Sequence, residues 1–106
     1  MSYRYMRLIL FFDLPTETGE DRREYARFRR FLIKSGFIMM QKSVYSKLSM
    51  TQNAAESIVE SVRKNKPAKG TVQALIITEK QYGRIEYILG ARSGDILDSD
   101  ERFVEL

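Results

Sequence analysis

The sequence predicts a single α+β domain over residues 1–106, with two helices packed on one face of a small sheet. Its length is that of one domain. Segments with a strand pattern alternate with two segments of helical pattern. Hydrophobic residues make up 43% of the chain, which is enough for one compact core but not for an additional deep, enclosed cavity.

The first predicted elements are a strand and a helix. Residues 5–13 (YMRLILFFD) are apolar at nearly every position, as is typical of a central strand covered on both faces. After a loop that contains proline, a helix is expected to open at Glu20 or Asp21 and to run to Ser35. Gly36 follows it and is expected to end it.

A second strand and a second helix are expected next. Residues 37–47 (FIMMQKSVYSK) predict one long strand. Ser49 and Gln52 have the spacing of a capping box, and the helix that they begin should continue to about Lys64. Its apolar residues are three and four positions apart and form one face; they are Ala55, Ile58, Val59 and Val62.

The remaining segments complete the predicted sheet. Residues 71–78 (TVQALIIT) predict a strand, and residues 84–89 predict a further short one. After a polar, acidic loop, residues 102–106 (RFVEL) alternate like a last strand. This order of elements predicts a ferredoxin-like βαββαβ sandwich with an extra C-terminal strand.

The predicted architecture leaves one face of the sheet without a cover. Two helices can cover only one face, although the strands carry apolar residues on both. In the first strand, Leu8, Leu10 and Phe12 lie on one face, and Ile9 and Phe11 lie on the other. Soluble monomers avoid large exposed apolar patches. We therefore expect a face-to-face homodimer, and regard a folded-back C-terminal segment, which is short and acidic, as the weaker alternative.

Composition excludes several kinds of chemistry. The chain has no cysteine and no histidine, so disulfides, thiolate centres, imidazole metal ligands and the commonest general acid–base are absent. Any catalysis would depend on carboxylates, hydroxyls, amines or a hard cation such as Mg²⁺. There is neither a secretory signal nor an apolar segment of membrane-spanning length, so a cytoplasmic protein without membrane association is expected.

The first predicted helix has a basic face. Its cations are spaced three and four positions apart, and a flanking arginine precedes them; the candidates for binding nucleic acid are Arg22, Arg23, Arg27, Arg30 and Lys34. Glu20 and Glu24 can pair with Arg23 and Arg27, whereas Arg30 and Lys34 have no acidic residue one turn before them. Aligned, unpaired cations suit a phosphate backbone. An ordinary solvated helix face is the alternative, because the net charge of +4 is only mildly basic.

Two further groups of polar residues are candidates for function. Asp13 ends the apolar first strand, where it could shape the turn or, beside its copy across a two-fold axis, bind a metal ion. Gln41, Ser43 and Tyr45 share one side of the predicted long strand by alternation. This polar row could face solvent, nucleic acid or a partner protein.

Several of these features together resemble one known family. The motifs are an apolar first strand that ends in Asp13, a basic helix that leads through Ser35-Gly36-Phe37, and Gln41-x-Ser43-Val44-Tyr45. They resemble the smaller of the two universal CRISPR-associated adaptation proteins, which works with the spacer integrase. The resemblance spans nearly the whole chain and is closest to members from type II systems.

The resemblance implies a ferredoxin-like homodimer that bridges two integrase dimers and carries double-stranded spacer DNA across its middle. It also implies Mg²⁺ at the dimer axis with Asp13 as ligand, because many relatives are described as metal-dependent endonucleases. In this chain Ser46 stands where an acidic residue often follows the Ser-Val-aromatic triplet. Lys69-Gly70 stands where relatives often carry Asp. These departures favour a scaffold over a nuclease.

Three functions follow from these observations. We favour a DNA-binding scaffold subunit of the spacer-integration complex. The alternatives are a Mg²⁺-dependent endonuclease that acts on RNA or DNA through paired Asp13 residues, and an RNA-binding module like an RRM, whose third-strand aromatic residues are missing from residues 71–78. We also expect Phe103 and Val104 to extend a sheet edge of the partner subunit or of the integrase.

Overall fold

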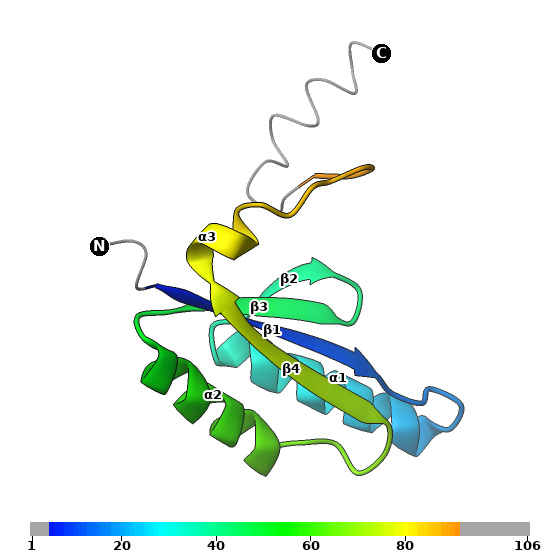
Figure 1. Ribbon diagram of the computed structural model, residues 1–106. Coiled ribbons are helices and arrows are strands. Elements are labelled where there is room, and N and C mark those ends of the chain that lie inside the picture. Colours follow the sequence, from blue (N-terminus) through cyan, green and yellow to red (C-terminus); the bar gives the residue numbers. More distant parts are fainter. Residues whose placement is uncertain (1–4, 92–106) are drawn as a thin grey trace.

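In the computed structural model, which describes residues 5–91, a four-stranded antiparallel sheet carries two helices on one face (Figure 1). The elements are β1 (Met6–Asp13), α1 (Gly19–Lys34), β2 (Ile38–Gln41), β3 (Val44–Ser49), α2 (Gln52–Lys64), β4 (Thr71–Thr78) and α3 (Glu79–Tyr82). The strand order β2-β3-β1-β4 confirms the predicted ferredoxin-like α+β fold. The strand expected at residues 102–106 lies outside the described residues.

The central strand β1 fixes the position of the core. It pairs with β3 on one side and with β4 on the other along nearly its whole length. Leu8, Leu10 and Phe12 point toward the helices, where they pack in one cluster with Phe28 and Leu32 of α1. Burial of each such side chain stabilises the fold by roughly 1.5–3 kcal/mol. The continuous apolar pattern of β1 therefore follows from its place in the middle of the sheet.

The capping residue of α1 sets where this helix begins. Thr18 accepts a hydrogen bond on its hydroxyl from the Asp21 backbone N–H at 3.0 Å, and its own N–H donates to the Asp21 carboxylate at 3.2 Å. This capping box places the first helical residue at Gly19, slightly before the predicted start. The helix stops at Lys34, and Gly36 follows with a φ of +93°, as the glycine in the sequence predicts.

The helix α2 has the predicted length and apolar face, but a different cap. The hydroxyl of Thr51 accepts the hydrogen bond from the Ala54 N–H at 3.0 Å, whereas Ser49 donates to the carbonyl oxygen of Thr51. Thr51, and not Ser49, is therefore the N-cap. Ala55 and Val62 are buried on the predicted face.

The prediction of one long strand over residues 37–47 is wrong. The chain turns at Lys42 and Ser43, so the segment forms the hairpin of β2 and β3, with a bulge between Met39 and Gln41. Ser43 has a φ of +67°, a conformation that glycine and asparagine usually supply. Because neither residue type marks this turn, the sequence pattern favours an uninterrupted strand.

The segment after β4 also differs from the prediction. No strand is assigned at residues 84–89; instead α3 follows β4 directly, capped by Thr78, whose hydroxyl accepts from the Gln81 N–H. Arg7 holds this short helix, with two hydrogen bonds to the Glu79 carboxylate at 2.8 and 2.6 Å and its guanidinium 4.2 Å from the centre of the Tyr82 ring.

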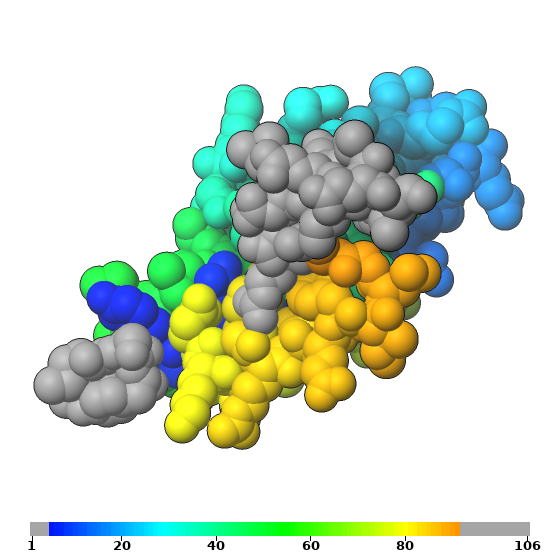
Figure 2. Space-filling view, turned by 90° about the horizontal axis from the view of Figure 1, so that it is seen from above, coloured from blue at the N-terminus to red at the C-terminus, as the bar shows by residue number. Residues whose placement is uncertain are grey.

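The short helix α3 does not join α1 and α2 on their face of the sheet. It lies on the side away from α1 and α2 (Figure 1), and in the view from above its yellow surface adjoins the orange surface of the residues that follow it (Figure 2). Within residues 5–91, no helix is long and apolar enough to cross a membrane.

Candidate nucleic-acid interface

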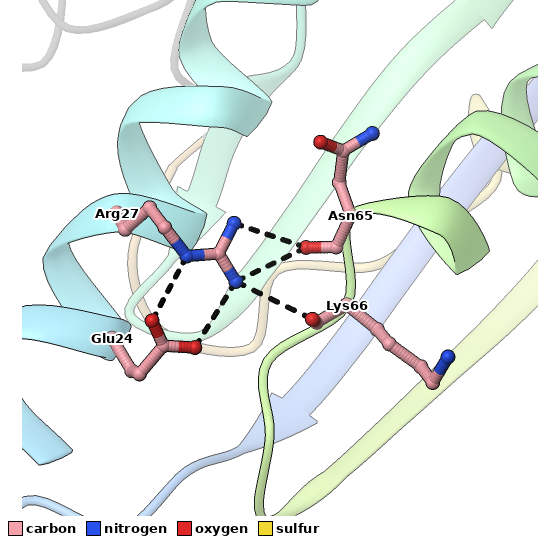
Figure 3. Close-up of polar contacts among 4 residues, drawn as sticks. All are labelled: Glu24, Arg27, Asn65 and Lys66. Atoms are coloured by element: carbon pink, nitrogen blue, oxygen red, sulfur yellow. Dashed lines mark hydrogen bonds and ion pairs between the residues drawn. The ribbon is translucent and has the colours of Figure 1, made fainter.

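In the predicted basic row on α1, Arg27 is bound to its own chain. Its guanidinium donates to the Glu24 carboxylate at 3.0 and 3.2 Å and to the carbonyl oxygens of Asn65 and Lys66, each at 3.3 Å (Figure 3). Those carbonyls follow the end of α2, where backbone acceptors lack helical partners. Arg27 therefore connects α1 to the end of α2.

The same contact changes the acidity of Glu24. The hydrogen bond from Arg27 is the main cause that lowers the pKa of Glu24 below its ordinary value of 4.5, and the charge of Arg27 and a backbone hydrogen bond from Ala68 act in the same direction. Glu24 and Arg27 thus form the pair that their spacing predicts, whereas the pair expected of Glu20 and Arg23 does not form within the described residues.

Arg22 also binds its own chain. Its guanidinium donates to the carbonyl oxygens of Thr16 and Glu17, at 3.1 and 3.2 Å, and so braces the loop between β1 and α1. The remaining predicted cations, Arg23, Arg30 and Lys34, are exposed and form no hydrogen bond or ion pair within residues 5–91. These three residues, which we call the outward row, are the part of the predicted basic face that is free to bind a ligand.

Asp13 lies at the C-terminal end of β1, as the sequence predicts, and is exposed. In register it faces Thr71 of β4. Within the described part of the chain, no three acidic side chains lie close enough together to hold a metal ion. Mg²⁺ prefers octahedral oxygen coordination and usually keeps several waters beside one or two carboxylates, so a Mg²⁺ ligand role for Asp13 stays a prediction.

Gly70 brings the loop before β4 close to Asp13. It has a φ of +100°, and a Cβ atom placed on it would lie 2.6 Å from the Asp13 carbonyl oxygen and 2.8 Å from Cδ2 of Leu14. Only glycine fits this approach without moving the backbone. The glycine of Lys69-Gly70 is therefore required by packing at the end of β1.

The predicted polar row of Gln41, Ser43 and Tyr45 does not exist, because the hairpin turn separates its members. Gln41 is exposed on β2, and Ser43 is half-buried in the turn, with its hydroxyl 3.3 Å from that of Tyr25. Tyr45 is only 1% exposed and packs in the core, where its hydroxyl accepts from Nε of Arg29 at 2.9 Å. A partner contact by Tyr45 is therefore not supported. Phe103 and Val104 lie outside the described residues.

The sheet face opposite the helices remains partly open, as the sequence predicts. Its exposed apolar side chains include one or more from every strand: Ile38, Leu48, Phe11 and Leu75. Their exposed fractions lie between 37% and 48%. On the same face, Ser46 is fully buried beside Ile9, and its hydroxyl has no hydrogen-bond partner among residues 5–91.

The strand order, the outward row and Asp13 at the end of β1 define a small ferredoxin-like α+β protein with a cationic helix surface. Residues 6–85 match the family model described as CRISPR associated protein Cas2. The chain therefore belongs to the Cas2 family of CRISPR-associated proteins, which confirms the resemblance found in the sequence.

Individual relatives support this assignment. A CRISPR-associated endoribonuclease Cas2 from Treponema denticola is 54% identical, over 95% of this chain and 100% of its own length. The protein of the same name from Streptococcus mutans is 46% identical, over 95% of this chain and 93% of its own. A solved crystal structure of cas2 aligns with a TM-score of 0.56 at 13% identity, over 84% of this chain and 91% of that chain, and shows the shared fold.

Proposed function

We propose that this protein is a DNA-binding scaffold subunit of the CRISPR spacer-integration complex, and that it acts as a homodimer that bridges integrase dimers and holds spacer duplex DNA. The observation that carries the proposal is the outward row of Arg23, Arg30 and Lys34, whose charges have no partner within the described residues. Membership of the Cas2 family supports the CRISPR setting.

The outward row has the properties of a site for a phosphate backbone. Arg23 and Lys34 are eleven residues apart, about 16 Å along a helix. Because these cations have no ion pair within residues 5–91, binding a phosphate breaks no contact described there. Such contacts supply affinity without sequence readout, which suits a protein that must accept spacers of any sequence.

The open sheet face supports the dimeric part of the proposal. Phe11 of β1 and Leu75 of β4 are diagonal neighbours on this face, since Leu75 pairs with Ile9, and both are exposed. A second copy packed on this face would remove them from water, and each square ångström of apolar surface so buried contributes about 25 cal/mol. A two-fold pair also presents two outward rows, which doubles the number of cations available to phosphates.

Charge reversal in the outward row tests the proposal. In Arg23→Glu/Lys34→Glu we expect the affinity for duplex DNA to fall at least tenfold. The salt dependence of binding should also flatten, by about one unit of slope for each phosphate that the variant no longer neutralises. The matched control is Lys64→Glu/Lys80→Glu, which makes the same charge change at exposed lysines of α2 and α3.

The readouts are fluorescence anisotropy over a range of salt concentrations and spacer acquisition in cells. Light scattering establishes the mass of each variant; a wild-type particle with the 12.4 kDa mass of one chain would contradict the dimer. An equal decrease of DNA binding in both double variants would show that only net charge matters and would remove the outward row as the site.

A second candidate function is a metal-dependent nuclease, because the curated relatives are named endoribonucleases. Asp13 is the only acidic residue of β1, so two copies across a dimer axis would supply two carboxylates. Two carboxylates can hold Mg²⁺ only weakly. In Asp13→Ala we expect any Mg²⁺-dependent cleavage of RNA to disappear while duplex binding and spacer acquisition persist. Loss of acquisition with binding and dimer intact would favour the nuclease.

A further inference from the structure

A second cationic surface lies between α1 and the hairpin of β2 and β3. It is an open hollow of about 550 Å³, and the charged side chains that line it are Arg29 and Arg30 from α1 and Lys42 from the hairpin turn. Among residues 5–91, no aspartate or glutamate lines it. Arg30 and Lys42 have no ion pair within residues 5–91, so three positive charges surround one hollow without a neighbouring acid.

Arg29 is held in position by the core beneath the hollow. Its Nε donates to the hydroxyl of Tyr45, whose buried ring stacks on Phe12 with the ring centres 5.6 Å apart. This contact is with a neutral group and leaves the charge of Arg29 uncompensated. The two terminal nitrogens form no hydrogen bond within the described residues, so the guanidinium can donate two parallel hydrogen bonds to an oxyanion.

The opposite wall of the hollow is also fixed. The carbonyl oxygen of Ser43 accepts from the Phe12 N–H at 3.0 Å, which ties the hairpin turn to β1. The Ser43 hydroxyl lies 3.3 Å from the hydroxyl of Tyr25, which ties the same turn to α1. The backbone of Lys42 is thereby held across from Arg29 and Arg30. Of the three cations, Arg29 is already in place when an anion enters the hollow, which lowers the cost of ordering it.

We infer that this hollow binds a phosphate group of a single-stranded nucleic acid. Arg29, Arg30 and Lys42 would contact this phosphate. The hollow lies between a helix and a hairpin, so a flexible strand can enter it more readily than a rigid duplex. Tyr25 and Met39 also line it and offer apolar surface to a base or sugar. The inference does not depend on the duplex contact proposed for Arg23 and Lys34.

The test uses full-length protein and three probes: inorganic phosphate, a short oligothymidylate with a 5′-phosphate, and the same oligothymidylate without it. Lys42→Met removes one charge while it leaves the contact between Arg29 and Tyr45 intact, and Lys64→Met is the control at an exposed lysine of α2. We expect Lys42→Met to bind both oligonucleotides at least fivefold more weakly than wild type, with Lys64→Met unchanged.

The outcomes separate this inference from the proposed function. Arg23→Glu/Lys34→Glu should weaken duplex binding more than single-strand binding, and Lys42→Met should do the reverse; Arg30, which belongs to both surfaces, is left unchanged. Equal single-strand affinity for wild type and Lys42→Met overturns the inference. If the oligonucleotides bind no more tightly than inorganic phosphate, the hollow is a small-anion site and the assignment to nucleic acid is wrong.

Discussion

Arg27 and Arg30 lie about one turn apart on α1, yet they face different surroundings. Arg27 donates its hydrogen bonds to Glu24 and to two backbone carbonyls after α2. Arg30 lines an open hollow and has no partner within residues 5–91. The difference shows that a regular spacing of cations places them on one helix face, but does not determine which of them bind internal groups and which stay free for a ligand. The neighbouring elements decide which charges are satisfied inside the molecule.

The surroundings of Arg27 extend to the loop before β4. Among the substitutions considered, we expect the largest loss of stability at Gly70 in this loop. Gly70→Ala would place a methyl group against backbone and Leu14 at a φ of +100°. We expect the free energy of unfolding to fall by about 3 kcal/mol, from left-handed strain together with overpacking. Urea denaturation followed by circular dichroism measures it.

The control for this prediction is Gly36→Ala. Gly36 has nearly the same φ, +93°, but its added methyl group would meet only the end of the flexible Lys47 side chain. The cost should be limited to backbone strain, about 1–2 kcal/mol. If both alanine variants are destabilised equally, the close approach at Gly70 is not what holds the loop.

The next prediction compares how much Arg27 and Arg30 each contribute to stability. Arg27→Met should destabilise the fold by about 1 kcal/mol, because it removes hydrogen bonds that are only partly shielded from water. Arg30→Met should stay within about 0.5 kcal/mol of wild type. For a domain of this size, the first change corresponds to roughly 4–8 °C in melting temperature. Equal destabilisation by Arg30→Met and Arg27→Met would contradict this difference between the two arginines.

The sequence predicts the fold well wherever periodicity is strong. The strand at residues 71–78 has its predicted bounds, and the second helix buries its predicted face. The hairpin was missed because Lys42-Ser43 contains no glycine, asparagine or aspartate, the residues that readily take a positive φ, so only the tertiary structure shows the positive φ of Ser43. The short helix α3 had a visible signal, the capping-box spacing of Thr78 and Gln81.

The candidate site was less predictable for a physical reason. Local spacing identified the pair of Glu24 and Arg27, because residues three positions apart on a helix are neighbours. It could not identify the carbonyl oxygens of Asn65 and Lys66, which lie far along the chain from Arg27. The hollow beside Arg29 was missed for the same reason, since its second wall is the hairpin that the sequence did not reveal.

The smallest expected effect is the pH dependence that Glu24 adds to stability. Its pKa is lowered in the folded protein, mainly by the hydrogen bond from Arg27, whereas the unfolded chain keeps the ordinary value of 4.5. The unfolded state therefore binds the proton more readily. The stabilisation from Glu24 is present above this value and disappears as the pH falls toward the lower folded-state pKa.

Glu24→Gln removes this titration while it keeps a side chain of similar size. We expect wild type to be more stable than Glu24→Gln at pH 7 and the difference to shrink between about pH 5 and pH 3. Urea midpoints measured across this range give the difference directly, and Glu20→Gln, at an exposed glutamate that forms no described ion pair, is the control. A difference between wild type and Glu24→Gln that stays constant as the pH falls would mean that the carboxylate contributes no charge-dependent stability. Arg27 would then hold the two helices through the carbonyl oxygens alone.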